Sequence, residues 1–285
     1  MKRESKTLRS ALYLPASNAR AIEKAESLEA DAIIFDLEDA VSVEHKAQAR
    51  DAACAAVANG KAGSSISIIR INGLDTPWGK DDFEAALISK PDAILVPKIN
   101  IAGDVQKIAN RMSDVTTVLW VMIETAQSVL DVQSIATASP KLECLVLGTN
   151  DLAKETRMSM DMQREALMPS LTQCVIAGRA AGIHILDGVF NDFKNADDFL
   201  LECQQGKRFG MDGKTLIHPS QIDPCNSVFS PSLDDLQKAQ RIVEVFEQPE
   251  NHSANVVSID GQMVERLHAE MAKEELERGK AIGLI

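Results

Sequence analysis

Two carboxylates of this chain, Glu124 and Asp151, each come soon after a short apolar run, VLWVMI and LVL respectively. Carboxylates that converge in a site shielded from water repel one another unless a cation neutralises them. Oxygen ligands without histidine or cysteine suit a hard cation such as Mg²⁺, which takes one or two carboxylates and keeps water or substrate oxygens in its other positions. These residue types predict a Mg²⁺ site, with Mn²⁺ as a substitute. Each acid could instead cap the next helix or pair with a lysine.

Arg70 closes another apolar run, ISIIR, and its guanidinium could hold a carboxylate or enolate oxygen through two parallel hydrogen bonds. A salt bridge to the acidic stretch 36–39 is an alternative that is compatible with this role. Lys98 also follows a run, but crowded acids would keep it protonated, which disfavours a Schiff-base lysine. The predicted substrate-binding residues are therefore Arg70, Lys98, Asp36 and Pro97.

These polar residues belong to a repeating pattern in which a short apolar run is followed by a helix-sized segment. The runs cover residues 12–14, 32–37, 66–71, 93–96, 118–123, 145–147, 184–189 and 215–217. Apolar strands that alternate with helices indicate a parallel sheet covered on its outside, and eight of them are the number in a closed (β/α)₈ TIM barrel. A doubly wound open sheet is the alternative. In a barrel the polar ends of the strands, including Asp187 and His218, meet at one cavity, although His218 could equally stabilise a turn.

We expect residues 1–250 to form the barrel, with 234–248 as its eighth helix. Residues 251–285 would form a C-terminal extension that begins irregularly and ends in a charged helix over 262–280. This stretch is too short for an independent domain, so it should pack on the barrel or on a neighbouring subunit.

Composition narrows the class of protein further. The 285 residues carry a net charge of −12, which argues against a nucleic-acid or membrane-surface partner because both need a basic face. Five scattered cysteines without a C-x-x-C pair indicate neither a zinc site nor a disulfide framework, and favour a reducing cytoplasm. The charged start MKRE is followed by no long apolar run, so we expect no signal peptide and no membrane span.

Several short motifs occur together in a fixed order along the chain. They are AIIFDLEDAV from residue 32, RIN from 70, VPK from 96, MIET from 122, GTNDLA from 148, DGV from 187, GKTLIHPSQI from 213 and IDGQMV from 259. In this order and spacing the chain resembles the citrate lyase β-subunit and malyl-CoA lyase family of metal-dependent barrel aldolases, from about residue 9 to residue 271. The resemblance implies a homo-oligomer, a trimer or hexamer, that acts on a small CoA thioester or keto acid.

The resemblance also implies a role for individual residues. Glu124 and Asp151 would be the protein ligands of Mg²⁺, and Arg70 would stabilise an enolate. The catalytic set would further contain Glu38 and Asp39, which hold metal-bound water, and Asp260, a general acid/base supplied by the C-terminal segment of a neighbouring subunit.

The activity implied is Mg²⁺-dependent cleavage of a carbon–carbon bond in a 3-hydroxyacyl-CoA of the malyl-, citramalyl- or citryl-CoA type, with coenzyme A as part of the substrate. The same site could instead hydrolyse the thioester, or act as a CoA-independent keto-acid aldolase. The chain could also be a lyase subunit that needs an acyl-carrier partner, or a homologue kept only for assembly. It departs from the family pattern at Ala16, where a Val-Pro-Gly-type turn is usual, and at Asn150, where a hydrophobic residue is common.

Overall fold

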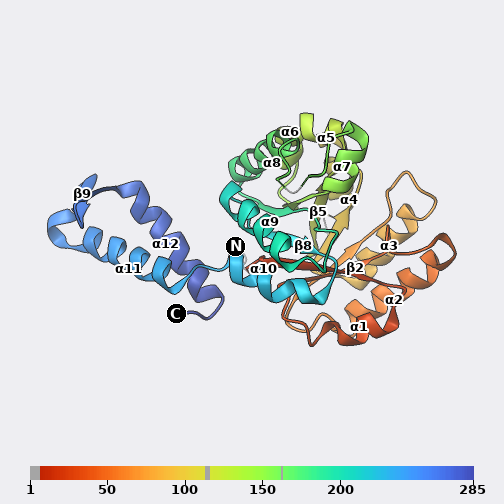
Figure 1. The fold of residues 1–285 in the computed structure, drawn as a ribbon. Coiled ribbons are helices and arrows are strands. Elements are labelled where there is room, and N and C mark those ends of the chain that lie inside the picture. Colours follow the sequence, from red (N-terminus) through yellow and green to blue (C-terminus); the bar gives the residue numbers. More distant parts are fainter. Residues whose placement is uncertain (1–6, 113–115, 162) are drawn as a thin grey trace. The chain divides into compact units, whose positions relative to one another are not determined.

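The computed structural model describes residues 7–112, 116–161 and 163–285 (Figure 1). The charged N-terminal residues on which the absence of a signal peptide was predicted lie outside these ranges. The described chain separates into two compact units, Leu8–Phe229 and Ser230–Ile285, the second of which also includes Thr7.

The unit Leu8–Phe229 is a closed barrel of eight parallel strands in sequential order, which confirms the predicted fold. The strands are β1 Ser10–Pro15, β2 Ala32–Asp36, β3 Ile66–Arg70, β4 Ala93–Val96, β5 Val118–Ile123, β6 Leu142–Leu147, β7 His184–Asp187 and β8 Gly213–Leu216. Pairing of β1 with both β2 and β8 closes the ring.

Helices follow each strand and cover the outside of the barrel (Figure 1). They are α1 Ala19–Ala25, α2 Lys46–Ala58, α3 Gly79–Ser89, α4 Ala102–Arg111, α5 Ala126–Leu130, α6 Val132–Ala136, α7 Thr149–Thr156, α8 Met168–Ala181, α9 Ala196–Phe209 and α10 Ile222–Phe229. Short 3₁₀ turns, η1 Val43–His45 and η2 Pro219–Gln221, precede α2 and α10. Helix α10 is therefore the last helix of this unit.

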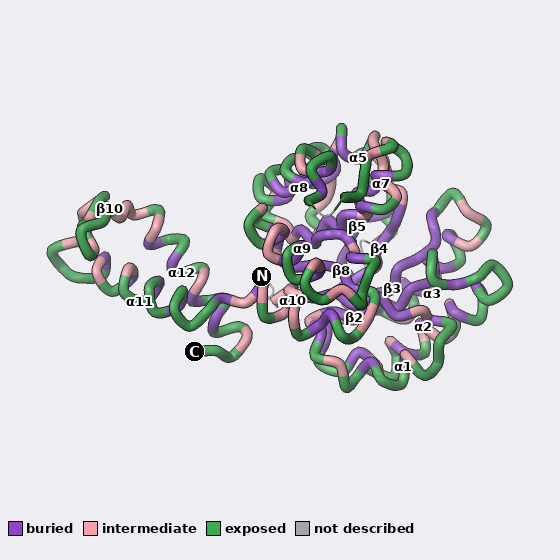
Figure 2. The backbone as a smooth tube through the Cα atoms, viewed as in Figure 1, coloured by how far each residue is buried: buried purple, intermediate pink, exposed green. Residues whose placement is uncertain are grey.

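The strands are largely buried (Figure 2). Alternate residues along them pack in two separate cores. One core fills the barrel interior, and its members include Ile34, Ile68, Leu95, Trp120 and Val146. The other lies between strands and helices, and it includes Phe35, Ile69, Ile94, Val121 and Leu145. Because side chains alternate along each strand, the interior set fixes which polar residues at the strand ends point inward.

The unit Ser230–Ile285 holds two long helices and a small hairpin. Its elements are α11 Leu233–Glu247, η3 Pro249–Asn251, β9 Val256–Ile259, β10 Gln262–Glu265 and α12 Arg266–Ala281. Helices α11 and α12 share an apolar core formed by Leu236, Ala239, Val243, Ala272 and Leu276.

Two expectations for this region were wrong. The barrel unit ends at Phe229 instead of residue 250, so the helix predicted over 234–248 belongs to the second unit as α11. The predicted helix over 262–280 starts only at Arg266, because residues 262–265 pair antiparallel with β9. Asp260 and Gly261 join these strands, both with positive φ (52° and 77°), the backbone that a tight two-residue hairpin turn requires.

Candidate active site

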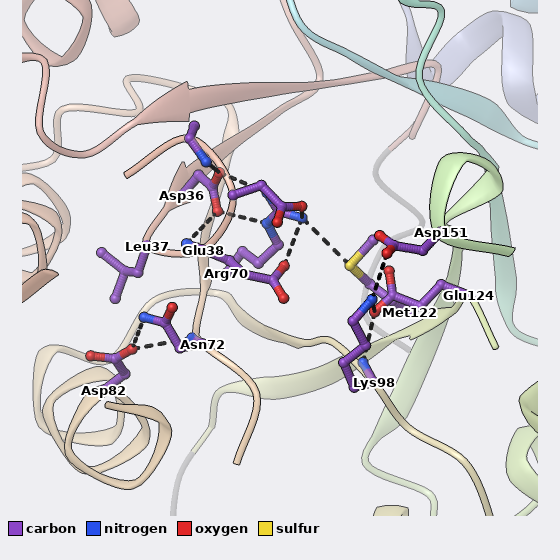
Figure 3. Close-up of polar contacts among 12 residues, drawn as sticks. Asp36, Leu37, Glu38, Arg70, Asn72, Asp82, Lys98, Met122, Glu124 and Asp151 are labelled. Carbon is purple, nitrogen blue, oxygen red and sulfur yellow. Dashed lines mark hydrogen bonds and ion pairs between the residues drawn. The ribbon is translucent and has the colours of Figure 1, made fainter. Parts of the chain in front are cut away.

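Most of the polar residues predicted at the strand ends form two adjacent clusters at the carboxyl-terminal mouth of the barrel (Figure 3). The first, which we call the arginine cluster, consists of Arg70 with Asp36, Glu38 and Asp39. The second, the lysine cluster, consists of Lys98 with Glu124 and Asp151. Met122 lies between them, and its sulfur is 3.8 Å from Nη1 of Arg70. In a barrel of this kind, residues at this end of the strands carry the chemistry.

Arg70 is held rigidly by Asp36, its register partner on the neighbouring strand. Its Nε donates to one carboxylate oxygen at 2.6 Å, and its Nη2 donates to the other at 2.7 Å. Asp36 also accepts from the backbone N–H groups of Glu38 and Ala40. Burial alone would lower the pKa of Arg70, but the negative charge of Asp36 outweighs it, so the guanidinium stays charged.

Asp36 therefore positions Arg70, and its direct contact with a substrate stays a prediction. Its side chain is fully buried, and both of its oxygens are committed to Arg70 and the backbone. The alternative salt bridge between Arg70 and the acidic stretch is thus present, and it leaves only Nη1 of the guanidinium to face the other acids and a ligand.

Glu38 and Asp39 both approach this remaining nitrogen. Oε2 of Glu38 lies 2.9 Å from Nη1 of Arg70, and Oδ2 of Asp39 lies 3.4 Å from it. Burial raises the pKa of Glu38 to about 8; Arg70 opposes this effect, while Asp39 and Glu124 add to it. Asp39, by contrast, has an exposed side chain. Glu38 can therefore gain or lose a proton near neutral pH beside a fixed positive charge.

The lysine cluster brings the two predicted metal ligands to one point. Nζ of Lys98 is 3.4 Å from Oε1 of Glu124 and 3.0 Å from Oδ1 of Asp151. The backbone at Lys98 has φ 57°, and its N–H donates to the same Glu124 oxygen at 2.8 Å. Burial raises the pKa of Glu124, and the nearby charge of Lys98 counteracts this rise.

The position of Lys98 shows that this pair of carboxylates can hold a cation. Among the residues that the structure describes, no group of three or more His, Cys, Asp or Glu side chains is arranged to bind a metal ion. A site with two carboxylates therefore fits Mg²⁺, which needs only one or two, better than it fits zinc, which takes three or four protein ligands. Burial would lower the pKa of Lys98, but Glu124 and Asp151 raise it. This is the opposite of what a Schiff-base lysine needs.

Gly148 gives Glu124 the space it occupies. A Cβ atom at Gly148 would lie 2.4 Å from Cβ of Glu124 and 2.6 Å from its Oε2. The glycine that opens the GTNDLA motif therefore permits close approach of two strand ends. Asp151 comes from the first turn of α7, three residues further on. Pro97 is buried directly before Lys98, and its contact with a substrate stays a prediction.

Asp187 does not face the barrel mouth, which corrects our expectation. It is fully buried, accepts from Nη1 of Arg164 at 2.8 Å, and pairs with Nζ of Lys214 at 3.0 Å. Lys214 also binds Glu202 of α9 at 2.6 Å. These four residues form a buried ion network, so Asp187 contributes to the fold. Arg164 was not singled out in the sequence because it lies outside the strands and matches no motif.

Two other predicted residues are also placed by the structure. His218 stacks on Phe193, with ring centroids 4.5 Å apart, and its Nδ1 accepts from the N–H of Ser220, so it does stabilise a turn. Asp260 is exposed in the hairpin turn of the second unit and pairs with Arg241 of α11 at 2.7 Å. Its catalytic role stays a prediction.

The turn that departs from the family pattern is accommodated without strain. Ala16 is buried, its N–H donates to the carbonyl of Asp36, and it has no positive φ that would demand glycine. It borders a hollow of about 300 Å³ that lies between α1 and α2, away from both charged clusters.

No helix in the described part of the chain combines the length and the apolarity needed to cross a bilayer.

Comparison with known proteins agrees with this geometry. A (3S)-malyl-CoA thioesterase of Cereibacter sphaeroides is 46% identical over 99% of this chain and 98% of its own length. The citrate lyase subunit beta of Leuconostoc mesenteroides is 32% identical over 90% of this chain and 88% of its own. The solved structure of CitE from Mycobacterium tuberculosis with magnesium, acetoacetate and coenzyme A matches with a TM-score of 0.81 and 25% identity, covering 96% of this chain and 98% of that one. The family model HpcH/HpaI aldolase/citrate lyase matches residues 9–219, and the chain belongs to this family.

Proposed function

We propose that this protein hydrolyses the thioester of a short 3-hydroxyacyl-CoA of the malyl-CoA type, with Mg²⁺ held by Glu124 and Asp151. The observation that carries the proposal is the contact of a fixed guanidinium, Arg70, with the partly buried carboxyl of Glu38, whose pKa burial raises to about 8. The similarity over nearly the full length to proteins named (3S)-malyl-CoA thioesterase supports the substrate class.

The arginine cluster supplies what thioester hydrolysis needs. Arg70 binds the thioester oxygen, where negative charge develops as water attacks the carbonyl carbon. Glu38 accepts the proton of that water, the carbon–sulfur bond breaks, and the leaving thiolate takes up the proton. Mg²⁺, when bound, supplies Lewis-acid stabilisation of substrate oxygens. Lys98 can contact a substrate carboxylate, because its ammonium group is partly exposed beside the same site.

Carbon–carbon cleavage is the second candidate, and two observations favour it. The family includes citrate lyase β-subunits, and Asp260 is exposed in a tight turn. In this reaction a base removes the hydroxyl proton, the C2–C3 bond breaks, and a keto acid leaves while Arg70 holds the enolate oxygen. Asp260 then protonates the enolate carbon.

Asp260 would reach such a site from a neighbouring subunit. The second unit carries exposed apolar side chains on the hairpin and on α12, namely Val256, Met263, Leu267 and Met271. An exposed apolar group of this kind is typical of a surface that another chain covers. We therefore propose a homo-oligomer, a trimer or hexamer, in which the unit packs on the next subunit.

Product analysis of purified protein tests both candidates. With Mg²⁺ and malyl-CoA, hydrolysis releases free CoA and malate, whereas cleavage releases acetyl-CoA and glyoxylate. EDTA should abolish either reaction, and added Mg²⁺ should restore it. Formation of acetyl-CoA without free CoA would overturn the thioesterase proposal in favour of the lyase. Absence of both products with malyl-, citramalyl- and citryl-CoA would refute both candidates.

Asp260→Asn separates the two reactions further. The substitution should leave Mg²⁺ binding and thioester hydrolysis intact, because hydrolysis uses Glu38 as the base. It should remove carbon–carbon cleavage, because the enolate would lack its proton donor. Equal loss of both activities would contradict this division of roles.

A further inference from the structure

Tyr13, the only tyrosine in the chain, lies beneath the arginine cluster. It belongs to β1 and pairs in register with Ile34 of β2. Both side chains are members of the apolar core inside the barrel, together with Trp120 and Met122. The phenol therefore projects into the barrel interior, and only 8% of the residue is accessible to solvent.

The hydroxyl group of Tyr13 is buried without a hydrogen-bond partner among the residues that the structure describes. Buried hydroxyl groups are normally paired, so an unpaired one calls for a functional explanation. The guanidinium of Arg70 does not provide the partner, because it stacks on the ring with its carbon 4.6 Å from the ring centroid. Nε and Nη2 of Arg70 instead donate hydrogen bonds to the carboxylate of Asp36.

The surroundings keep this hydroxyl protonated. Burial raises the pKa of Tyr13, and although Arg70 lowers it, the charges of Asp36, Glu124 and Glu38 raise it again. A phenol that keeps its proton is a hydrogen-bond donor. Tyr13 lies two residues before Pro15, the register partner of Asp36, and its ring lies against the guanidinium of Arg70, so this side chain borders the arginine cluster from inside the barrel.

We propose that Tyr13 is a specificity residue, whose O–H donates a hydrogen bond to a carboxylate or keto oxygen of the substrate while Arg70 binds beside it. The inference rests on the proposed function for its substrate class. A site built to donate this bond should reject an acyl group that lacks the oxygen, because the buried hydroxyl would then stay unpaired. The chain thus selects for an oxygen-bearing acyl group such as malyl over a plain acyl group.

Tyr13→Phe is the decisive variant because it removes one oxygen and keeps the ring that Arg70 stacks on. Calorimetry in the presence of Mg²⁺ would measure the binding of oxaloacetate, a four-carbon keto diacid. We expect the Kd for oxaloacetate to rise at least tenfold in Tyr13→Phe, with the Mg²⁺ affinity and the melting temperature preserved. The variant should also lose its preference for malyl-CoA over acetyl-CoA as a thioester substrate.

A second measurement observes the hydroxyl directly. Because the chain has one tyrosine, protein labelled with ¹³C at the tyrosine Cζ gives one resonance from this residue. Oxaloacetate with Mg²⁺ should move this resonance, whereas Mg²⁺ alone should leave it in place.

The outcomes separate this inference from the proposed function. Binding of oxaloacetate with equal affinity by wild type and Tyr13→Phe, or an unmoved resonance at saturation, would refute the role of Tyr13 and leave the proposed function standing. Failure of the wild type to bind oxaloacetate would also refute the role of Tyr13, whereas failure to turn over malyl-, citramalyl- and citryl-CoA would count against the proposed function.

Discussion

Replacing Glu38 by glutamine should change how the stability of the protein depends on pH. Burial raises the pKa of Glu38 from its ordinary value of 4.5 to about 8 in the folded chain, against the opposing charge of Arg70. Between these two values the folded protein keeps a proton that the unfolded chain has released. The free energy of unfolding must therefore fall as the pH rises through this window. The stability associated with this group is complete below pH 4.5 and is lost by about pH 8.

The size of the effect follows from the same two values. A pKa difference of about 3.5 pH units, at about 1.4 kcal/mol each, corresponds to an upper limit of about 5 kcal/mol. Glutamine has nearly the same shape and does not titrate, so Glu38→Gln should gain about 2 kcal/mol or more over wild type between pH 5 and pH 8. Its side-chain oxygen can still accept from Arg70.

Urea unfolding followed by the fluorescence of the two tryptophans, of which Trp120 is buried, measures this difference. Because all other groups are the same in both proteins, the relevant quantity is how the difference in unfolding free energy between variant and wild type changes with pH. Asp39→Asn is the matched control, because Asp39 contacts the same arginine but has an exposed side chain. Parallel pH profiles for wild type and Glu38→Gln would refute the reasoning.

The same variant should also be a poor enzyme. A base must be deprotonated to act, so hydrolysis by the wild type should increase with pH up to about 8 and then level off. Glu38→Gln should lower kcat by about 100-fold or more and remove that rise. A stabler but inactive variant is the combination we expect.

Three further substitutions test the site and its support. Gly148→Ala should weaken Mg²⁺ binding at least tenfold by calorimetry, because its Cβ would lie 2.6 Å from a carboxylate oxygen of Glu124, whereas Gly103→Ala, with its nearest new contact at 3.7 Å, should not. Arg70→Lys should lower kcat/KM about 100-fold in steady-state assays and leave Mg²⁺ affinity unchanged, since lysine cannot replace the planar guanidinium; unchanged kcat/KM would exclude the role in binding the oxyanion. Asp187→Asn should destabilise the fold by about 3 kcal/mol in urea unfolding by leaving buried cations without their counter-charge, so an unchanged midpoint would disprove its structural role.

Most of the strands could be predicted from the sequence because they are buried on both faces and are therefore largely apolar. The same property hid the direction of side chains at the strand ends. In an apolar strand, polar and apolar residues do not alternate. The sequence therefore does not reveal that Glu124 points into the barrel and Asp187 points out of it. Motif order singled out the two carboxylates that we propose as metal ligands, but the contact of Lys98 with both depends on a positive φ that no local pattern signals.

The end of the barrel was missed for a different reason. Helix α11 is amphipathic, as expected of a helix that covers a barrel. An amphipathic pattern predicts that one face is buried, but it does not identify the element that buries this face. The hairpin was a missed signal, because Asp260-Gly261 between two short β-prone stretches is a strong hairpin dipeptide. Tyr13 was not predicted as a site residue, because a single aromatic residue in an apolar run is typical of a hydrophobic core. Only its unpaired hydroxyl, which the structure reveals, distinguishes it from an ordinary core residue.

The division of the chain after Phe229 has a consequence for the evolution of such enzymes. The residues that we propose to bind the oxyanion and the cation all lie before the division, and the predicted proton donor Asp260 lies after it. Mutation or recombination can therefore change how a bound substrate is protonated without disturbing the packing that holds the charged clusters together. A single ancestral barrel could in this way give rise to descendants that hydrolyse a thioester and to others that break a carbon–carbon bond.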